Sequence, residues 1–256
     1  MVYSICRFNV GAFPAGAACT MVSRLIGTQG KGNPMATPQD IPANPQPTKD
    51  RVGAPDVAPP ELLPTTEEEL HAAHVDQPPA RLDGPVLLAD YDPAWPVLYA
   101  REAERVRAAL GERVLFLEHV GSTSVPGMAA KPKIDMLLGV ADSADEAAYV
   151  PALVTAGYVL HIREPNWHEH RLFKGPDTDI NLHVFSAGHP EIARMLLFRD
   201  WLRDNETDRR FYEQIKRELA ARTWTYAQHY ADAKTAVVEQ IIARATAADA
   251  APGDKL

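Results

Sequence analysis

Proline is distributed unevenly along this chain of 256 residues, and this limits where a compact domain can form. Twelve of the 22 prolines lie before residue 80, and no sustained strand or helix period appears there, apart from a short helical pattern over 65–73. Such a segment does not bury enough apolar surface to offset its conformational entropy. We therefore expect a disordered proline-rich tail over 1–83, one folded domain over 84–247 and a short tail over 248–256.

The pattern after residue 84 changes repeatedly between helical and strand periods. Helices are expected over 91–112, 141–158, 189–205, 206–222 and 225–247, and strands over 113–120, 133–140, 158–163, 171–175 and 180–186. The run Met136 to Val140 is apolar, which favours a central strand. This order predicts an α/β (α+β) domain: a mixed sheet of about five strands flanked by helices, with a helical C-terminal part.

The overall composition limits the class of partner. A formal net charge of −8 argues against sequence-independent binding of nucleic acid, which needs a clustered basic surface. The apolar runs are too short to cross a bilayer, so no membrane association is expected. The two cysteines, Cys6 and Cys19, have no zinc-binding spacing and fit a reducing, cytoplasmic setting. The oligomeric state stays open.

The stretch EHVGSTSVPGMAAKPKID, residues 118–135, joins two predicted strands and is poor in core-forming side chains. Its glycines allow unusual backbone geometry, and its hydroxyls and amides are the groups that phosphate oxygens need. The candidate phosphate-binding residues here are Gly121, Ser122, Thr123, Ser124 and Lys131. A plain solvated connector is the alternative interpretation.

Asp135 is the one charged residue in the apolar run from Ile134 to Val140. A carboxylate in buried surroundings is costly unless it is paired or binds a cation. The sequence therefore marks Asp135 as a candidate metal-binding or catalytic group, with a structurally paired carboxylate as the alternative.

Four segments together resemble the GrpB family, small bacterial proteins assigned to the nucleotidyltransferase superfamily. The segments are DYDPAWP, EHVGSTSVPGMAAKPKIDMLL, INLHVF and LFRDWLRDN, and the resemblance runs from about Pro85 to Arg244. The family has long been described as of unknown function, although relatives occur joined to dephospho-CoA kinase. The resemblance implies a nucleotidyltransferase-like fold and a phosphorylated ligand, with a nucleotide as the expected class.

In that superfamily a Gly-Ser pair holds the nucleotide phosphates, and acids on two strands hold Mg²⁺. Gly121 and Ser122 match the pair, and Asp135 matches the first acid. The position of the second acid is occupied by Leu137, and the later strand carries Asn181 and His183 in place of an evident third acid. The resemblance thus implies Mg²⁺ at Asp135 with an incomplete acidic set, so nucleotidyl transfer stays open.

Other polar residues extend the candidate site. His183 points away from the apolar face of its strand and is a candidate base or orienting group beside Asp135. Arg171, Lys174 and Arg199 are candidate phosphate contacts. Two alternative functions remain: a non-catalytic ligand-binding or regulatory module with a degenerate site, and a metallohydrolase based on His168, His170 and His183.

Overall fold

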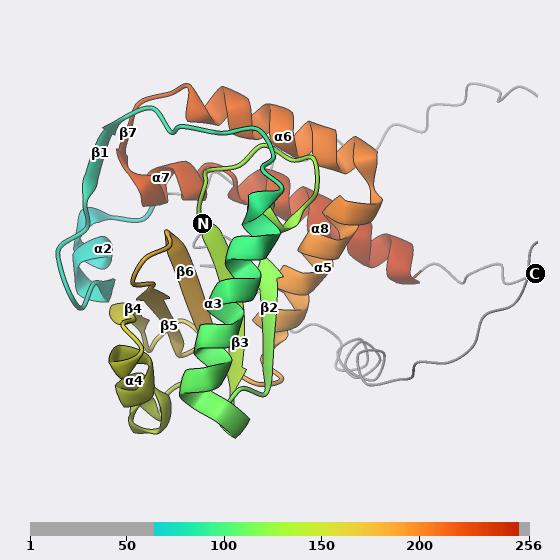
Figure 1. The fold of residues 1–256 in the computed structure, drawn as a ribbon. Coiled ribbons are helices and arrows are strands. Elements are labelled where there is room, and N and C mark those ends of the chain that lie inside the picture. Colours follow the sequence, from blue (N-terminus) through green and yellow to red (C-terminus); the bar gives the residue numbers. More distant parts are fainter. Residues whose placement is uncertain (1–63, 251–256) are drawn as a thin grey trace, which may run out of the picture.

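The structure, a computed structural model, describes residues 64–250 of the chain (Figure 1). The helices are α2 (Glu67–Ala73), α3 (Ala94–Leu110), α4 (Glu146–Thr155), α5 (Pro190–Asp204), α6 (Glu206–Ala220), α7 (Ala227–Asp232) and α8 (Thr235–Ala250). The strands are β1 (Arg81–Gly84), β2 (Phe116–Val120), β3 (Ile134–Val140), β4 (Val159–Glu164), β5 (His170–Lys174), β6 (Ile180–Ser186) and β7 (Trp224–Tyr226). Two 3-10 turns, η1 (Gly111–Arg113) and η2 (Ser122–Ser124), follow α3 and β2.

A five-stranded sheet in the order β2-β3-β6-β5-β4 forms the centre of the domain. Strands β3 and β6 are parallel, and the other neighbouring pairs are antiparallel. All seven residues of β3 are buried, which agrees with its central position. The predicted mixed α/β sheet of five strands with a helical C-terminal part is therefore confirmed.

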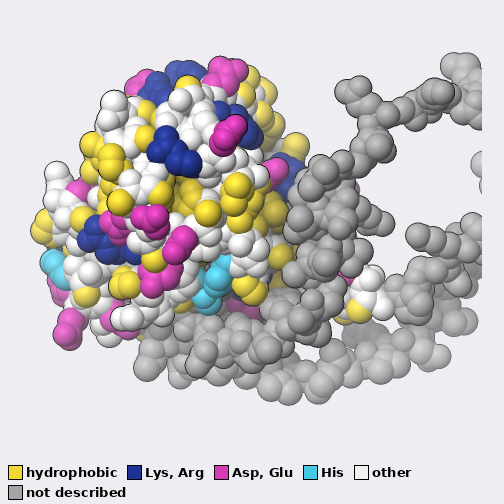
Figure 2. Space-filling view, turned by 90° about the horizontal axis from the view of Figure 1, so that it is seen from below, with side chains coloured by type: hydrophobic (Ala, Val, Ile, Leu, Met, Phe, Trp, Pro, Cys, Tyr) yellow, Lys and Arg dark blue, Asp and Glu magenta, His cyan; other side chains and the backbone are white. Residues whose placement is uncertain are grey.

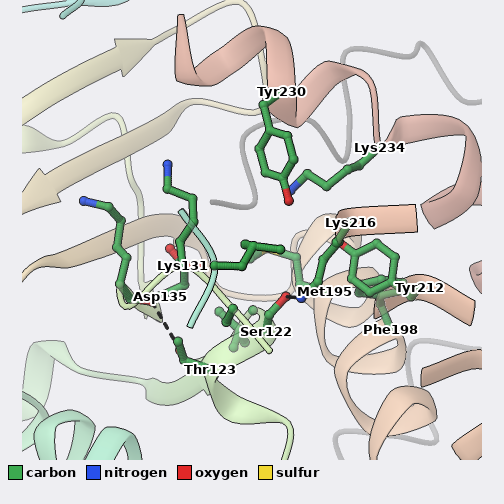
Figure 3. A pocket seen from close by; sticks show the side chains of 15 residues that line it. Ser122, Thr123, Lys131, Asp135, Met195, Phe198, Tyr212, Lys216, Tyr230 and Lys234 are labelled. Carbon is green, nitrogen blue, oxygen red and sulfur yellow. Dashed lines mark hydrogen bonds between the residues drawn. The ribbon is translucent and has the colours of Figure 1, made fainter. Parts of the chain in front are cut away.

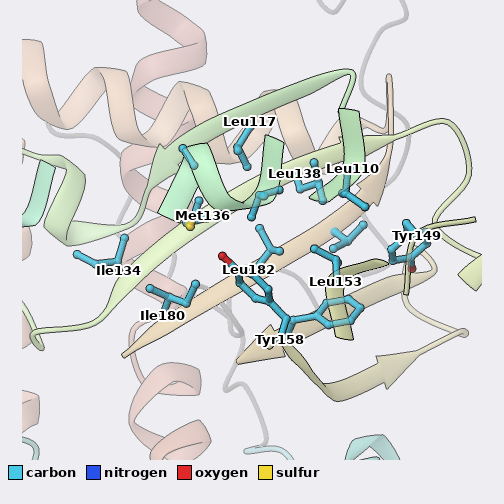
Figure 4. Close-up of a cluster of buried hydrophobic side chains, with 14 of the residues drawn as sticks. Leu110, Leu117, Ile134, Met136, Leu138, Tyr149, Leu153, Tyr158, Ile180 and Leu182 are labelled. Atoms are coloured by element: carbon cyan, nitrogen blue, oxygen red, sulfur yellow. The ribbon is translucent and has the colours of Figure 1, made fainter. Parts of the chain in front are cut away.

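Helices cover both faces of this sheet, because successive side chains of a strand point to opposite sides. Met136 and Leu138 pack against α3 and α4, in a cluster that includes Leu110, Tyr149 and Leu153 (Figure 4). Leu137, between them, packs on the other side with residues of α5, α6 and α8. Residues with the same parity as Leu137, including Asp135, thus face the C-terminal helices.

Local capping groups explain where several helices begin and end. The Asp92 carboxylate accepts a hydrogen bond from the Ala94 amide at the start of α3 (2.8 Å), and Gly111 ends the helix with φ +57°. Asn205 accepts from the Asp208 amide at 2.9 Å and begins α6. These boundaries agree with those expected from the sequence.

The predicted disordered tail extended too far toward the domain, because residues 64–83 are part of the folded unit. Thr66 and Glu69 form a reciprocal capping box that begins α2, and Ala73 packs with Ile162 and Leu172. Strand β1 pairs with β7, and the paired residues are 140 or 145 positions apart in the chain. These partners are distant in sequence, so a local search for periodicity could not detect them. Residues 1–63 and 251–256 lie outside the described residues.

The long helix expected over 225–247 is also corrected. Residues Trp224–Tyr226 form β7, and the helical remainder is divided into α7 and α8 around Ala233 and Lys234. The pairing of β7 with β1 outweighs the helical pattern at the start of this segment. The division places Lys234 at the junction between the two helices.

Candidate functional site

A pocket lies at the edge of the sheet where β2 ends and β3 begins. The loop between these strands forms one side, and residues of α5, α6, α7 and the α7–α8 junction form the other (Figure 3). We call it the lysine pocket; its charged lining residues are Lys131, Lys133, Lys216, Lys234 and Asp135. Its cavity volume is about 40 Å³, well below the roughly 300–1,000 Å³ typical of pockets that enclose a whole small-molecule ligand.

Gly121 is the first residue of the loop that follows β2, and its backbone conformation and surroundings both require glycine. Its φ is +70°, and a Cβ added there would lie 2.5 Å from Oδ2 of Asp135. Only glycine meets both conditions, the left-handed backbone and the close approach of the carboxylate. The sequence signal at Gly121 therefore reflects a direct contact between the loop and the predicted acid.

The hydroxyl groups of the loop have different surroundings. Ser122 lines the pocket, and its Oγ accepts a hydrogen bond from Lys216 Nζ at 2.9 Å. Thr123 also lines it, with Oγ1 at 3.0 Å from His119 Nε2. Ser124 donates to the Gly121 carbonyl at 2.6 Å and lies outside the pocket lining, so its hydroxyl stabilises the turn.

Asp135 is 4% exposed and lines the pocket. Its Oδ1 accepts a hydrogen bond of 2.8 Å from Asn181 Nδ2, because the two residues are paired across the parallel strands β3 and β6. The same oxygen is 3.8 Å from His183 Nε2. The carboxylate is thus paired within the sheet, and the residue also lines the pocket.

His183 lies behind Asp135 in a row of buried polar groups that crosses the sheet. His170 Nε2 is 3.0 Å from His183 Nδ1, and the other nitrogen of His170 is 2.8 Å from Glu164 Oε2. Burial lowers the pKa of His183 to about 4, so its imidazole is neutral near pH 7. His183 is 2% exposed and is not part of the pocket lining, which favours an orienting role over that of a base facing a ligand.

The fit of Mg²⁺ to this site can be tested from the donor groups. The position of the second acid holds Leu137, which is fully buried in the core. Within residues 64–250 there is no group of three or more His, Cys, Asp or Glu side chains arranged to hold a metal ion. One carboxylate beside several lysines does not fit a metal-ion pair, which needs bridging carboxylates.

The lysines supply the positive charge of the site. Lys216 is 2% exposed, and its Nζ donates to the Ala129 carbonyl at 2.5 Å and to Ser122 Oγ; burial lowers its pKa well below the usual range. Lys234 is 6% exposed and lies over the Tyr230 ring, with Nζ 4.7 Å from the centroid. Burial lowers its pKa to about 8. Buried lysines are costly, and both of these line the same pocket.

Three predicted phosphate contacts lie outside the lysine pocket. Arg171 is on the opposite face of the sheet, where Nε donates to Glu146 Oε1 at 2.6 Å. Arg199 donates to Glu118 at 2.8 Å and to Asp200 at 2.7 Å, and so joins α5 to β2. Lys174 lies in an adjoining second pocket and donates to Asn181 Oδ1 at 2.6 Å.

The proposed histidine metal site is not assembled. His168 and Glu169 have φ values of +58° and +48° and form a turn, so His168 does not share a strand face with His170 as the sequence suggested. The His168 ring lies against Trp167 and His189. The turn explains the difference, since the alternation of a strand does not apply to left-handed residues.

Lys216 and Lys234 were not among the phosphate-binding residues predicted from the sequence. Lys216 lies on α6 and Lys234 at the α7–α8 junction, 81 or more residues beyond Asp135, and a lysine in a helical sequence pattern is usually explained by an exposed face. The available signal was their spacing with tyrosines: Lys216 follows Tyr212, and Lys234 follows Tyr230, each by four residues. In the structure each ammonium group lies over the ring of that tyrosine.

The outer surface has a different charge pattern. On the face in Figure 2, Lys and Arg side chains lie beside Asp and Glu side chains, without a continuous basic area. Ion pairs such as Arg163–Glu146 and Arg217–Glu213 are typical of this pattern. Among the helices of the described part of the chain, none has the length and apolar character needed to span a membrane.

Comparisons of this chain with known proteins agree on one family. The family model described as GrpB protein matches residues 85–244. A UPF0157 protein of Halalkalibacterium halodurans is 58% identical over 184 residues, which are 72% of this chain and 94% of that protein. A dephospho-CoA kinase of Mycolicibacterium paratuberculosis is 32% identical over 164 residues, covering 54% of this chain and 40% of the kinase.

A solved structure agrees with this result. The crystal structure of conserved protein GrpB from Enterococcus faecalis has a TM-score of 0.55 and 28% sequence identity, and the match covers 64% of this chain and 99% of that one. The fold is consistent with the nucleotidyltransferase superfamily, as the resemblance implied. The chain belongs to the GrpB family.

Proposed function

We propose that this protein binds a phosphorylated small molecule of the nucleotide class and that the phosphate oxygens of this ligand lie in the lysine pocket. One observation carries the proposal: all five lysines within residues 64–250 line the lysine pocket or the pocket that adjoins it. Against them, the lysine pocket has a single carboxylate, Asp135. Charge-assisted hydrogen bonds from ammonium groups are among the strongest contacts available to phosphate.

Two further points support a nucleotide as the ligand. Gly121 and Ser122 occupy the positions of the phosphate-holding pair of the superfamily, and both line the pocket. Relatives named dephospho-CoA kinase match part of the chain, which supports nucleotide-linked chemistry. Because the acids for a metal-ion pair are not assembled, we propose binding without metal-dependent nucleotidyl transfer, the function of a ligand-binding or regulatory module.

Calorimetric titration with pyrophosphate tests this proposal. Lys216→Met removes one buried amino group that donates hydrogen bonds, and we expect affinity to fall by about 10- to 100-fold, the usual effect of losing a hydrogen bond to a charged group. Arg210→Met is the matched control, since it removes the same charge from an exposed site on the same helix. Unchanged affinity in Lys216→Met, or an equal loss in both variants, contradicts the proposal.

A search for product separates binding from turnover. The protein is incubated with each ribonucleoside triphosphate, Mg²⁺ and a panel of alcohol and amine acceptors, and release of pyrophosphate is measured. We expect binding of nucleotide without release. Sustained release that is lost in Asp135→Asn overturns the non-catalytic part of the proposal and leaves the binding part in place.

A further inference from the structure

A second pocket adjoins the lysine pocket and shares Lys131 and Lys133 with it. Its cavity volume is about 360 Å³, against about 40 Å³ for the lysine pocket. The other lining residues come from α2, β4, β5, β6, β7 and α7 and from residues 79–80. Lys131 and Lys133 therefore line both the small lysine pocket and the much larger second pocket.

The N-terminal segment that precedes the GrpB match forms one wall of this second pocket. Leu70, Ala73 and Ala80 line it, and α2 lies beside β4 (Figure 1). The Val75 amide donates to the His161 carbonyl at 3.0 Å, and the Thr65 amide donates to the Asp232 carboxylate at 2.8 Å. These bonds to β4 and α7 hold the segment in place, so the wall belongs to the fold.

The chemistry of the second pocket differs from that of its neighbour. Aliphatic side chains share the lining with the charged Glu164 and Lys174, and His74 and His161 meet edge to face with ring centroids 4.9 Å apart. Burial lowers the pKa of His161, which favours a neutral ring near pH 7. The amide of Gln228 adds hydrogen-bonding capacity. Flat apolar surfaces with a few polar groups suit a heteroaromatic base and its sugar.

We infer that the second pocket holds the nucleoside portion of the ligand, while Lys131 and Lys133 contact the phosphates that lead into the lysine pocket. This inference rests on the proposed function and adds the place where the nucleoside of the proposed nucleotide binds. It also gives the segment 64–83 a part in ligand recognition. The lysine pocket has much the smaller cavity of the two, and Lys131 and Lys133 line both, so phosphates attached to a nucleoside in the second pocket would pass these two lysines.

The test compares pyrophosphate with the four ribonucleoside diphosphates, which carry the same number of phosphates. Ala80→Trp places an indole in the second pocket from an exposed position. Ala72→Trp is the matched control, since Ala72 is exposed on α2 and lines neither pocket. For the wild type we expect one or more nucleoside diphosphates to bind at least about tenfold more tightly than pyrophosphate. Ala80→Trp should remove that gain and leave pyrophosphate affinity within about twofold; Ala72→Trp should change neither.

The outcomes separate the two claims. If pyrophosphate binds and no nucleoside diphosphate binds more tightly, or if Ala80→Trp keeps the gain, the second pocket does not hold a nucleoside and only this inference fails. If Ala80→Trp weakens pyrophosphate equally, the effect is not specific to the second pocket, and the inference fails again. If neither pyrophosphate nor any diphosphate binds the wild type, the proposed function fails with it. Melting temperatures of both variants confirm that each protein is folded.

Discussion

Lys216 Nζ lies 2.9 Å from Ser122 Oγ, so a buried ammonium group of α6 contacts the loop between β2 and β3 directly. The same nitrogen donates to the Ala129 carbonyl near the other end of that loop. Lys216 therefore fixes the shape of the loop and also places a hydrogen-bond donor in the lysine pocket. Its neighbour Lys234 has no such backbone contact among the described hydrogen bonds, and the two lysines should respond differently to mutation.

Lys234→Met is expected to stabilise the protein while weakening pyrophosphate binding. Burial makes the charged form of Lys234 unfavourable in the folded state, and methionine fills a similar volume without charge. We expect the free energy of unfolding at neutral pH to rise by about 1–3 kcal/mol and affinity to fall about tenfold or more.

Lys216→Met should lower stability, because the Ala129 carbonyl loses its partner. Urea unfolding and calorimetry measure both quantities; a destabilised Lys234→Met variant with normal affinity is the contrary result.

Pyrophosphate affinity should decrease as the pH rises above about 8, the pKa of Lys234. Burial and the charge of Lys131 lower this pKa, while Asp135 and Asp232 raise it. Binding requires the protonated lysine, so affinity falls by up to about tenfold per pH unit above the pKa.

Stability should change with pH in the opposite sense. The ordinary lysine pKa is 10.5, so between pH 8 and 10.5 the unfolded chain binds more protons than the folded one at Lys234. The contribution of this group to the free energy of unfolding therefore rises with pH across that range, and it is lost as pH falls through 8. In Lys234→Met both dependences should become shallower, and identical pH profiles for wild type and variant would exclude this lysine as their origin.

Gly121→Ala should destabilise the protein more than Gly127→Ala. Both glycines have positive φ, but a Cβ at Gly121 meets the Asp135 carboxylate, whereas a Cβ at Gly127 has no atom within 4 Å. We expect a cost of about 2–4 kcal/mol at Gly121 and about 1 kcal/mol at Gly127, since only the first adds a steric conflict to backbone strain. Unfolding in urea gives both values. Equal costs would show that the contact with Asp135 is not the reason for glycine at this position.

Asp135→Asn should strengthen pyrophosphate binding, because it removes the one negative charge that lines the lysine pocket. An increase of about two- to tenfold is expected, and a chelator should leave the affinity of both proteins within about twofold. If Asp135 instead holds Mg²⁺, the chelator weakens binding to the wild type, and Asp135→Asn abolishes the effect of Mg²⁺. Titrations with and without Mg²⁺ distinguish these results.

Much of the fold could be predicted because its signals are local. The apolar run in β3 indicated a central strand, and the alternation around His183 placed that residue and Asp135 on one face, as observed. The Gly-Ser loop could be located from its composition and its resemblance to a family. These features depend on neighbours within a few residues, where strand and turn periods are informative.

The remainder depends on contacts between distant parts of the chain. Strand β1 exists because Arg81 and Gly84 pair with a three-residue strand near the C-terminus. Arg171 and Arg199 looked available for phosphate, but Glu146 and Glu118 pair with them across elements. Lys216 and Lys234 enter the site only because α6 and the α7–α8 junction fold over the loop. No local pattern specifies such partners.

A crystal structure of the protein with pyrophosphate tests the central claim most directly, because it shows where phosphate oxygens bind. The account predicts phosphate oxygens within about 3 Å of Nζ of Lys216 or Lys234, with the loop carrying Gly121 and Ser122 alongside. A diphosphate bound at another surface, or a lysine pocket that stays free of phosphate at a saturating concentration, would contradict it.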